Sequence, residues 1–126
     1  MGSIGTVQNA RNRYNKKEIK MKKEKNNSRF AITSGRGFHV RFDNGYTLST
    51  QFGGGNYCNN YNDEIGRPEK DTKSPNAEIA IIDNEGEWAT EQAHLEITGE
   101  KLDDAVKGWV GVSEWKKYLD WTGEQK

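Results

Sequence analysis

Residues 35–60, which read GRGFHVRFDNGYTLSTQFGGGNYCNN, contain the strongest hairpin signal in the chain. At the centre lies Asp43-Asn44-Gly45, and Asn and Gly tolerate the positive φ that a tight primed turn requires. Apolar and polar residues alternate on both sides of this turn, which is the period of a strand with one apolar and one polar face. We therefore predict a central β-hairpin with strands near residues 36–42 and 46–52.

The hairpin leads into a loop, residues 53–60, that is rich in glycine, amide and aromatic side chains. Glycine lets backbone N–H groups approach phosphate oxygens closely. The hairpin is expected to bring this loop to the same end of the sheet as Gly35-Arg36-Gly37. A phosphate-bearing small molecule is one ligand class that suits these residues, although neither glycine cluster matches a Walker or dinucleotide fingerprint. The alternative is a set of flexible turns with surface tyrosines.

Three further segments carry strand patterns. Residues 28–34 predict a first strand, with Phe30 and Ile32 on one face. Residues 77–83 (AEIAIID) predict a strand that is covered on both sides, because its isoleucines and alanines leave neither face polar. A weaker strand is predicted through Leu95 and Ile97.

The last third of the chain changes to a helical period. Residues 103–112 are ambiguous, because two glycines weaken a helix there. Ser113 is expected to cap a helix that ends at Gly123. The apolar face of this helix is formed by Trp115, Tyr118 and Leu119. Trp121 lies off that face and is expected at a subunit contact.

These patterns predict an α+β fold: an antiparallel β-sheet of about five strands built on the central hairpin, with one or two C-terminal helices. The 126 residues suffice for one domain with a modest core. We assign residues 29–126 to this domain and residues 1–28 to a basic, flexible arm. No apolar run reaches membrane-spanning length, so no membrane partner is expected.

The net charge of zero conceals a division along the chain. Residues 1–29 carry nine Lys/Arg and two Asp/Glu, a charge of +7, and residues 30–126 therefore carry −7. The basic segment is interpreted as a solvated tail, as an arm that contacts nucleic acid, or as sequence upstream of a natural start at Met21. The −7 charge of the remainder disfavours a nucleic-acid partner.

The composition also favours a homo-oligomer. Only 32% of the residues are hydrophobic, while four Trp and five Tyr supply material for a subunit interface. The single cysteine, Cys58, excludes an internal disulfide and a cysteine-based zinc site.

The sequence contains no recognised catalytic motif. His39 and His94 are the only histidines, and neither lies in a known catalytic context. No metal-ligand spacing is present. We therefore expect no catalytic residue, no metal and no cofactor.

The candidate site consists of groups that suit a nucleotide. Arginines provide forked contacts to phosphate, aromatic rings stack on a base, and amides both donate and accept at base edges and ribose hydroxyls. Tyr61 offers a further ring face near the loop. The predicted ligand-binding residues are Arg36, Phe38, Arg41, Gly54, Asn56, Tyr57, Asn60, Trp88 and Trp109.

Four parts of the chain follow one another in a distinctive order: residues 38–60 (FHVRFDNGYTLSTQFGGGNYCNN), residues 76–83 (NAEIAIID), Trp88, and residues 106–121 (VKGWVGVSEWKKYLDW). Their order and spacing resemble a group of small phage-encoded proteins, the anti-Thoeris proteins. The resemblance covers roughly residues 30–122 and omits the basic arm.

The resemblance implies a non-enzymatic sponge that blocks host antiviral defence. Proteins of that group sequester the cyclic ADP-ribose isomer made by bacterial TIR defence enzymes, leave it uncleaved, and assemble as dimers or larger oligomers, for which a hexamer is one expectation. Some also hold cyclic oligonucleotide signals. The implied location is the cytoplasm of the infected bacterial host. The alternative is a small nucleic-acid-binding phage protein that uses the basic N-terminal arm.

Overall fold

The computed structural model describes residues 28–34, 36–63 and 71–126. The predicted basic arm lies outside these residues apart from Ser28, and Gly35 also lies outside them. In this part of the chain, no helix is long and apolar enough to cross a membrane.

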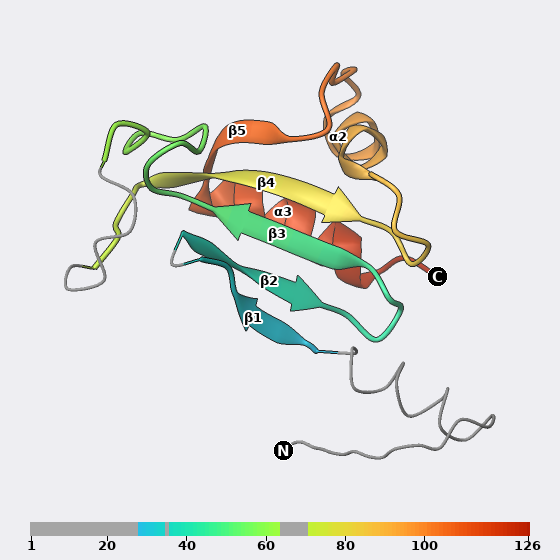
Figure 1. The fold of residues 1–126 in the computed structure, drawn as a ribbon. Coiled ribbons are helices and arrows are strands. Elements are labelled where there is room, and N and C mark those ends of the chain that lie inside the picture. Colours follow the sequence, from blue (N-terminus) through green and yellow to red (C-terminus); the bar gives the residue numbers. More distant parts are fainter. Residues whose placement is uncertain (1–27, 35, 64–70) are drawn as a thin grey trace, which may run out of the picture.

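One antiparallel sheet of five strands organises the fold, and its strands follow one another in sequence order (Figure 1). The strands are β1 (Phe30–Ile32), β2 (Gly37–Arg41), β3 (Thr47–Gln51), β4 (Asn76–Ile82) and β5 (Lys107–Gly111). The helices are α2 (Thr90–Thr98) and α3 (Val112–Gly123). The predicted α+β fold, with a five-stranded antiparallel sheet and C-terminal helices, is confirmed.

The central hairpin is present, but its turn differs from the predicted primed turn. Strands β2 and β3 pair from Gly37↔Gln51 to Arg41↔Thr47. Phe42 N–H donates to Tyr46 C=O, which leaves a three-residue loop. Gly45 alone in this loop has a positive φ, of 88°. Three-residue hairpin loops commonly end with a residue in this left-handed conformation. The Asn-Gly signal therefore predicted the hairpin correctly but the turn type wrongly.

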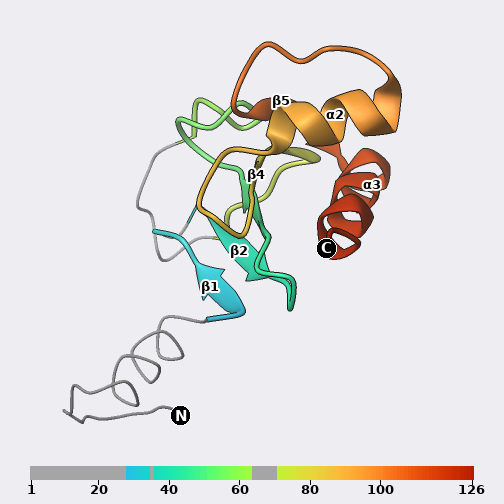
Figure 2. The same cartoon turned by 90° about the vertical axis from the view of Figure 1, so that its right-hand side faces the viewer.

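Both helices lie on one face of the sheet (Figure 2), and the hydrophobic core lies between the helices and this face. Leu48 and Ile81 pair across β3 and β4 and are fully buried beneath the helices. Ile79 is also fully buried. Burial of each such side chain contributes about 1.5–3 kcal/mol. The cross-strand partners of these residues point to the same face, so the alternation in the sequence identified the core face of the hairpin.

Helix α3 forms as predicted, with two corrections. It starts at Val112 after Gly111, which caps it without a side-chain hydrogen bond, so the predicted Ser113 cap is absent. Trp121 is only 7% exposed and lies in the core, because it follows Tyr118 by one helical turn. Its indole Nε1–H donates to Glu96 Oε1 over 2.8 Å. The expected subunit contact at Trp121 is therefore wrong.

The weak strand predicted through Leu95 and Ile97 is wrong, because this segment forms helix α2. The alternation of Leu95, Glu96 and Ile97 resembles a strand. However, Ala89 and Ala93 are buried, and Ile97 packs against the same core at the same four-residue spacing. Gly99 follows with φ 80°, a left-handed C-terminal cap. The ambiguous segment before α3 forms β5 instead.

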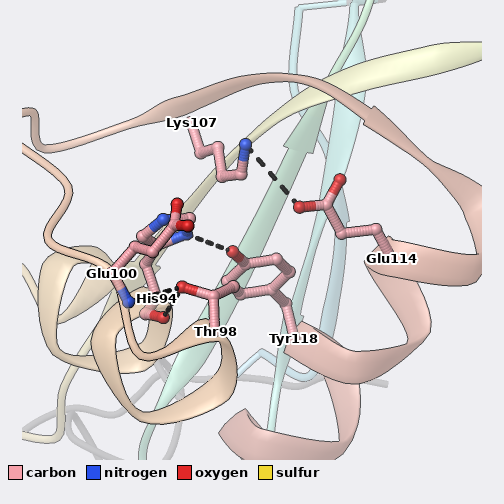
Figure 3. Close-up of polar contacts among 6 residues, drawn as sticks. All are labelled: His94, Thr98, Glu100, Lys107, Glu114 and Tyr118. Carbon is pink, nitrogen blue, oxygen red and sulfur yellow. Dashed lines mark hydrogen bonds and ion pairs between the residues drawn. The ribbon is translucent and has the colours of Figure 1, made fainter.

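A polar contact between the two helices fixes their packing (Figure 3). His94 Nδ1 lies 2.7 Å from the Tyr118 hydroxyl, and both side chains are buried. Thr98 Oγ1 donates to the His94 carbonyl oxygen. Burial raises the pKa of Tyr118 to about 12. Buried polar groups need such partners, so His94 is explained by the packing of α2 against α3.

Candidate functional site

Strand β5 carries an irregularity that places Trp109 in an unusual position. Ala77 pairs with Val110 and Ile79 pairs with Lys107, so β5 holds one more residue than β4 between these pairs. This β-bulge places Trp109 opposite Glu78, on the face of the sheet away from the helices. Trp109 has a φ of 51°, which costs a bulky residue about 1–3 kcal/mol. Such strain persists only where the surrounding structure enforces it.

The loop that follows β3 is tightly folded, and Asn60 organises it. Asn60 Oδ1 accepts hydrogen bonds from Gly53 N–H and from the Cys58 thiol, at 2.7 and 2.9 Å. Its Nδ2 donates to the Lys73 carbonyl oxygen over 2.7 Å. Cys58 is buried inside the loop, which is further closed by a bond from Gly55 N–H to Tyr61 C=O. The loop therefore has a defined shape, and Asn60 is occupied by its own chain.

This loop and β5 together present three aromatic rings, which we call the aromatic cluster: Tyr57, Tyr61 and Trp109. The ring centroids of Tyr57 and Trp109 are 5.8 Å apart, with 11° between the ring planes. The ring of Tyr61 also stacks with that of Tyr57, with centroids 6.4 Å apart and 10° between the planes. The three residues are 44%, 47% and 54% exposed, in chain order. Three parallel rings with free surface form a platform for a flat ligand.

Glycine at position 108 makes this arrangement possible. A Cβ atom on Gly108 would lie 2.6 Å from Tyr57 Cβ and 3.0 Å from the Tyr57 carbonyl oxygen. Contacts this short do not occur between real side chains, so any larger residue would displace the loop. The same close approach allows Trp109 N–H to donate to the Tyr57 carbonyl oxygen over 2.8 Å.

Two polar groups lie next to the aromatic cluster. Glu78 Oε1 accepts a hydrogen bond from Tyr57 N–H over 3.2 Å, which places a carboxylate beside the rings. Asn56 Nδ2 is buried and has no hydrogen-bond partner among the described residues. An unpaired buried donor costs about 1–3 kcal/mol. Because Asn56 Nδ2 has no exposed surface in the folded loop, an acceptor on a ligand reaches it only if the loop shifts. The Glu78 carboxylate disfavours a phosphate directly over the rings.

The structure gathers six of the nine predicted site residues at one end of the sheet, which we call the loop end. This end is marked by the cross-strand row of Gly37, Gln51 and Glu78. Phe52 N–H donates to the Arg36 carbonyl oxygen, so the β1–β2 turn and the loop begin side by side, as predicted. The six residues are Arg36, Gly54, Asn56, Tyr57, Asn60 and Trp109.

The other three predicted residues lie elsewhere. Phe38 points to the helix side, where its ring meets Trp115 edge-on at 6.4 Å. Arg41 lies at the opposite end of the sheet, which we call the hairpin end, in a cross-strand row with Thr47 and Ile82. Trp88 continues that row through a bridge to Ile82. These positions separate Arg41 and Trp88 from the aromatic cluster.

Strand geometry gives the scale of that separation. Arg41 lies four residues, about 13 Å, along β2 from the loop end, and three strand spacings, about 14 Å, from β5. The backbone of Arg41 is therefore about 19 Å from that of Trp109. One small nucleotide does not span this distance within one chain. Arg36 shares the loop end and is the better placed arginine.

Sequence reasoning missed two residues that form this site, Glu78 and Gly108. Glu78 appeared as one polar position in an apolar strand, and nothing in the sequence pairs it with Tyr57. Gly108 carried a usable signal, because a glycine beside a tryptophan within a strand indicates a bulge or a close backbone approach.

Among the described residues, no group of three or more His, Cys, Asp and Glu side chains is arranged to hold a metal ion. The chain matches no protein-family model, and no curated protein or solved structure is significantly similar to it. Function is therefore inferred from the residues and their geometry.

Proposed function

We propose that this protein is a non-enzymatic binding protein that sequesters a small nucleotide of the cyclic ADP-ribose type. The observation that carries the proposal is the exposed parallel stack of Tyr57 and Trp109 on a tightly folded loop. A base has a flat face that suits such rings, and each stacking contact of this kind contributes about 1–3 kcal/mol. By holding an immune signal in this way, the protein would block the antiviral defence of an infected bacterial cell.

The polar groups around the rings support the same assignment. Glu78, next to Tyr57, suits an amino group of a base, and the Asn56 amide suits an acceptor on a base edge once the loop shifts to expose its buried Nδ2. Arg36, at the same end of the sheet, is available for a phosphate that lies away from Glu78. Rings, amides and one carboxylate contain no pair of nucleophile and base, which favours retention of the ligand over its conversion.

Energetics favour a partner subunit in the complete site. Nanomolar retention needs about 12 kcal/mol. One or two stacking contacts and a few hydrogen bonds on an open platform supply about half of that. A second copy of the chain that covers the platform would add the remaining contacts, in keeping with the homo-oligomer expected from the lean composition.

The test is to incubate the purified protein with the product mixture of a TIR enzyme, wash it, and release bound molecules by heating for mass spectrometry. We expect one unmodified cyclic nucleotide in stoichiometric amount. Trp109→Ala should retain at most one tenth as much, whereas Trp88→Ala, which removes another exposed tryptophan at the hairpin end, should retain the parent amount. Release of a hydrolysed product beyond stoichiometry would instead place the protein among the enzymes.

The same experiment distinguishes the alternative of nucleic-acid binding. If nucleic acid co-purifies, binds in a strongly salt-dependent manner and is lost on deletion of residues 1–27, the basic arm is the binding element and the proposal is wrong.

A further inference from the structure

Strand β1 is the edge of the sheet, and its two large apolar side chains have no cover among the described residues. Phe30 and Ile32 are 79% and 84% exposed. Their cross-strand partners on β2, Val40 and Phe38, lie on the helix side of the sheet. The helices do not reach β1 (Figure 2). An exposed apolar edge of this kind favours pairing with another strand.

The hydrogen-bond pattern shows which backbone groups of β1 are free. Arg41 N–H donates to the Arg29 carbonyl oxygen, and Thr33 N–H donates to the Gly37 carbonyl oxygen. Residues 29, 31 and 33 therefore direct their backbone groups toward β2, because these directions alternate along an antiparallel pair. Phe30 and Ile32 consequently direct their N–H and C=O groups outward, away from the sheet.

We propose that β1 pairs antiparallel with β1 of a second copy of this chain, about a two-fold axis at Ala31. In this register Phe30 of each copy lies opposite Ile32 of the other, so their outward N–H and C=O groups form two symmetric pairs of hydrogen bonds. The four apolar side chains meet on the helix side, between the two α3 helices. The two sheets join into one continuous sheet.

Charge also permits this register. Arg29 is ion-paired with Asp43 of its own chain at 3.2 Å. In the proposed pairing each Arg29 lies opposite Thr33, so no like charges face each other across the junction. Strand edges that avoid self-pairing usually carry a lysine or another charge directed at the partner, and β1 has none at Phe30 or Ile32.

The strength of the contact follows from its size. A buried aromatic side chain removes about 150–250 Å² from water. With the same range taken for Ile32, the four side chains of two copies remove at most about 600–1,000 Å², less than the roughly 1,200–2,000 Å² that stable specific interfaces bury. The pairing alone predicts a concentration-dependent, weak dimer. The pairing does not depend on nucleotide binding, so the two proposals can fail separately.

Cysteine cross-linking of the full chain tests the register. In the proposed dimer the two Ala31 residues form a non-hydrogen-bonded pair, with their Cα atoms about 4.5 Å apart, within disulfide range. Ala31→Cys should therefore cross-link into a covalent dimer in an oxidising glutathione buffer. Phe30→Cys is the matched control, because its two Cα atoms would be about 8 Å apart. The parent protein, whose Cys58 is buried, should stay uncross-linked.

Sedimentation of charge variants provides a second readout. Ile32→Lys should weaken the concentration-dependent dimer at least tenfold, whereas Val112→Lys, at a 75% exposed valine outside β1, should leave it unchanged. Failure of Ala31→Cys to cross-link in a folded protein would overturn the proposal. Equal cross-linking of Ala31→Cys and Phe30→Cys, or a dimer unaffected by Ile32→Lys, would also overturn it.

Discussion

The two ends of the sheet each carry a loop with asparagine and glycine, but they use these residues differently. At the hairpin end, Asn44 Nδ2 donates to the carbonyl oxygens of Thr122 and Gln125, at 2.9 and 2.8 Å. Its Oδ1 accepts from Tyr46 N–H. At the loop end, Asn56 Nδ2 has no partner among the described residues, and Tyr57 beside it remains exposed.

This difference is the reason that we propose the loop end, and not the hairpin end, as the ligand site. Asn44 ties the hairpin to the C-terminal end of α3, where a helix has unsatisfied carbonyl groups. Both donor hydrogens of Asn44 are used within the fold, so Asn44 itself offers none to a ligand. Arg41 Nε, at the same end, is also buried without a partner among the described residues, so the contrast between the two ends rests on the exposed aromatic cluster. At the loop end, hydrogen bonds shape the loop but leave one buried amide donor unpaired and three aromatic rings partly exposed. Groups left unused by folding are the ones that a ligand can satisfy.

The largest expected loss of nucleotide affinity comes from Gly108→Ala at the loop end. The added Cβ collides with Tyr57 and displaces the loop from β5, so we expect nucleotide affinity to fall at least a hundredfold, about 2.7 kcal/mol. Gly111→Ala on the same strand is the control, because a Cβ there meets nothing within 4 Å. Calorimetric titration of both variants measures the effect. Equal affinities would show that the ligand does not use the Tyr57–Trp109 stack.

The next largest effect on affinity comes from comparing one substitution at each end of the sheet. Tyr57→Ala removes one ring and should weaken binding tenfold to a hundredfold, the value of one lost stacking contact. Arg41→Ala, at the hairpin end, should change affinity less than threefold, because its backbone lies about 19 Å from that of Trp109. The melting temperatures of both variants should stay close to that of the parent. A larger loss for Arg41→Ala than for Tyr57→Ala would move the site to the hairpin end.

A variant at the hairpin end should lower the stability of the protein and leave its nucleotide affinity unchanged. Asn44→Ala removes two hydrogen bonds to the end of α3 and one to Tyr46 N–H, so the free energy of unfolding should fall by about 1–3 kcal/mol. Nucleotide affinity should remain at the parent value. Urea denaturation and calorimetry measure the two quantities. A loss of affinity without a loss of stability would contradict the structural role of this end.

The smallest effect concerns pH and the packing of the helices. Because burial raises the pKa of folded Tyr118 to about 12, the folded state keeps its proton where the unfolded tyrosine, with a pKa near 10, loses it. This contribution to stability is complete below about pH 10 and is lost as the pH rises from about 10 to about 12. The free energy of unfolding of Tyr118→Phe should therefore change less with pH between about 10 and 12 than that of the parent. Equal changes in the two proteins would contradict the raised pKa of Tyr118.

The sequence predicted those parts of the fold that follow from local periodicity. Alternation around Asn44-Gly45 identified the hairpin, and the spacing of Trp115, Tyr118 and Leu119 identified α3. Helix α2 was missed because the small Ala93, which faces the core, gives little signal beside Leu95. Small core residues stabilise a helix only when they pack against another part of the folded chain, and a local sequence pattern does not show that packing.

The candidate site was predictable only in part, for a similar reason. Tyr57 and the loop were identified from composition. Their contact with Trp109 depends on a bulge and on Gly108, and the two rings come from segments distant in sequence. Arg41 was placed correctly on the polar face of its strand, but its distance from the loop follows from strand register across the sheet, which no local pattern provides.

The most direct test of the central claim, that the loop end binds the nucleotide, is a titration of isotope-labelled protein with a cyclic ADP-ribose isomer, followed by amide NMR. We predict saturable shifts at the backbone amides of Tyr57 and Trp109 and at the side-chain amide of Asn56, with Arg41 and Trp88 unchanged. Saturable shifts centred on Arg41 and Trp88, or no shifts under conditions in which mass spectrometry shows the ligand retained, would contradict it.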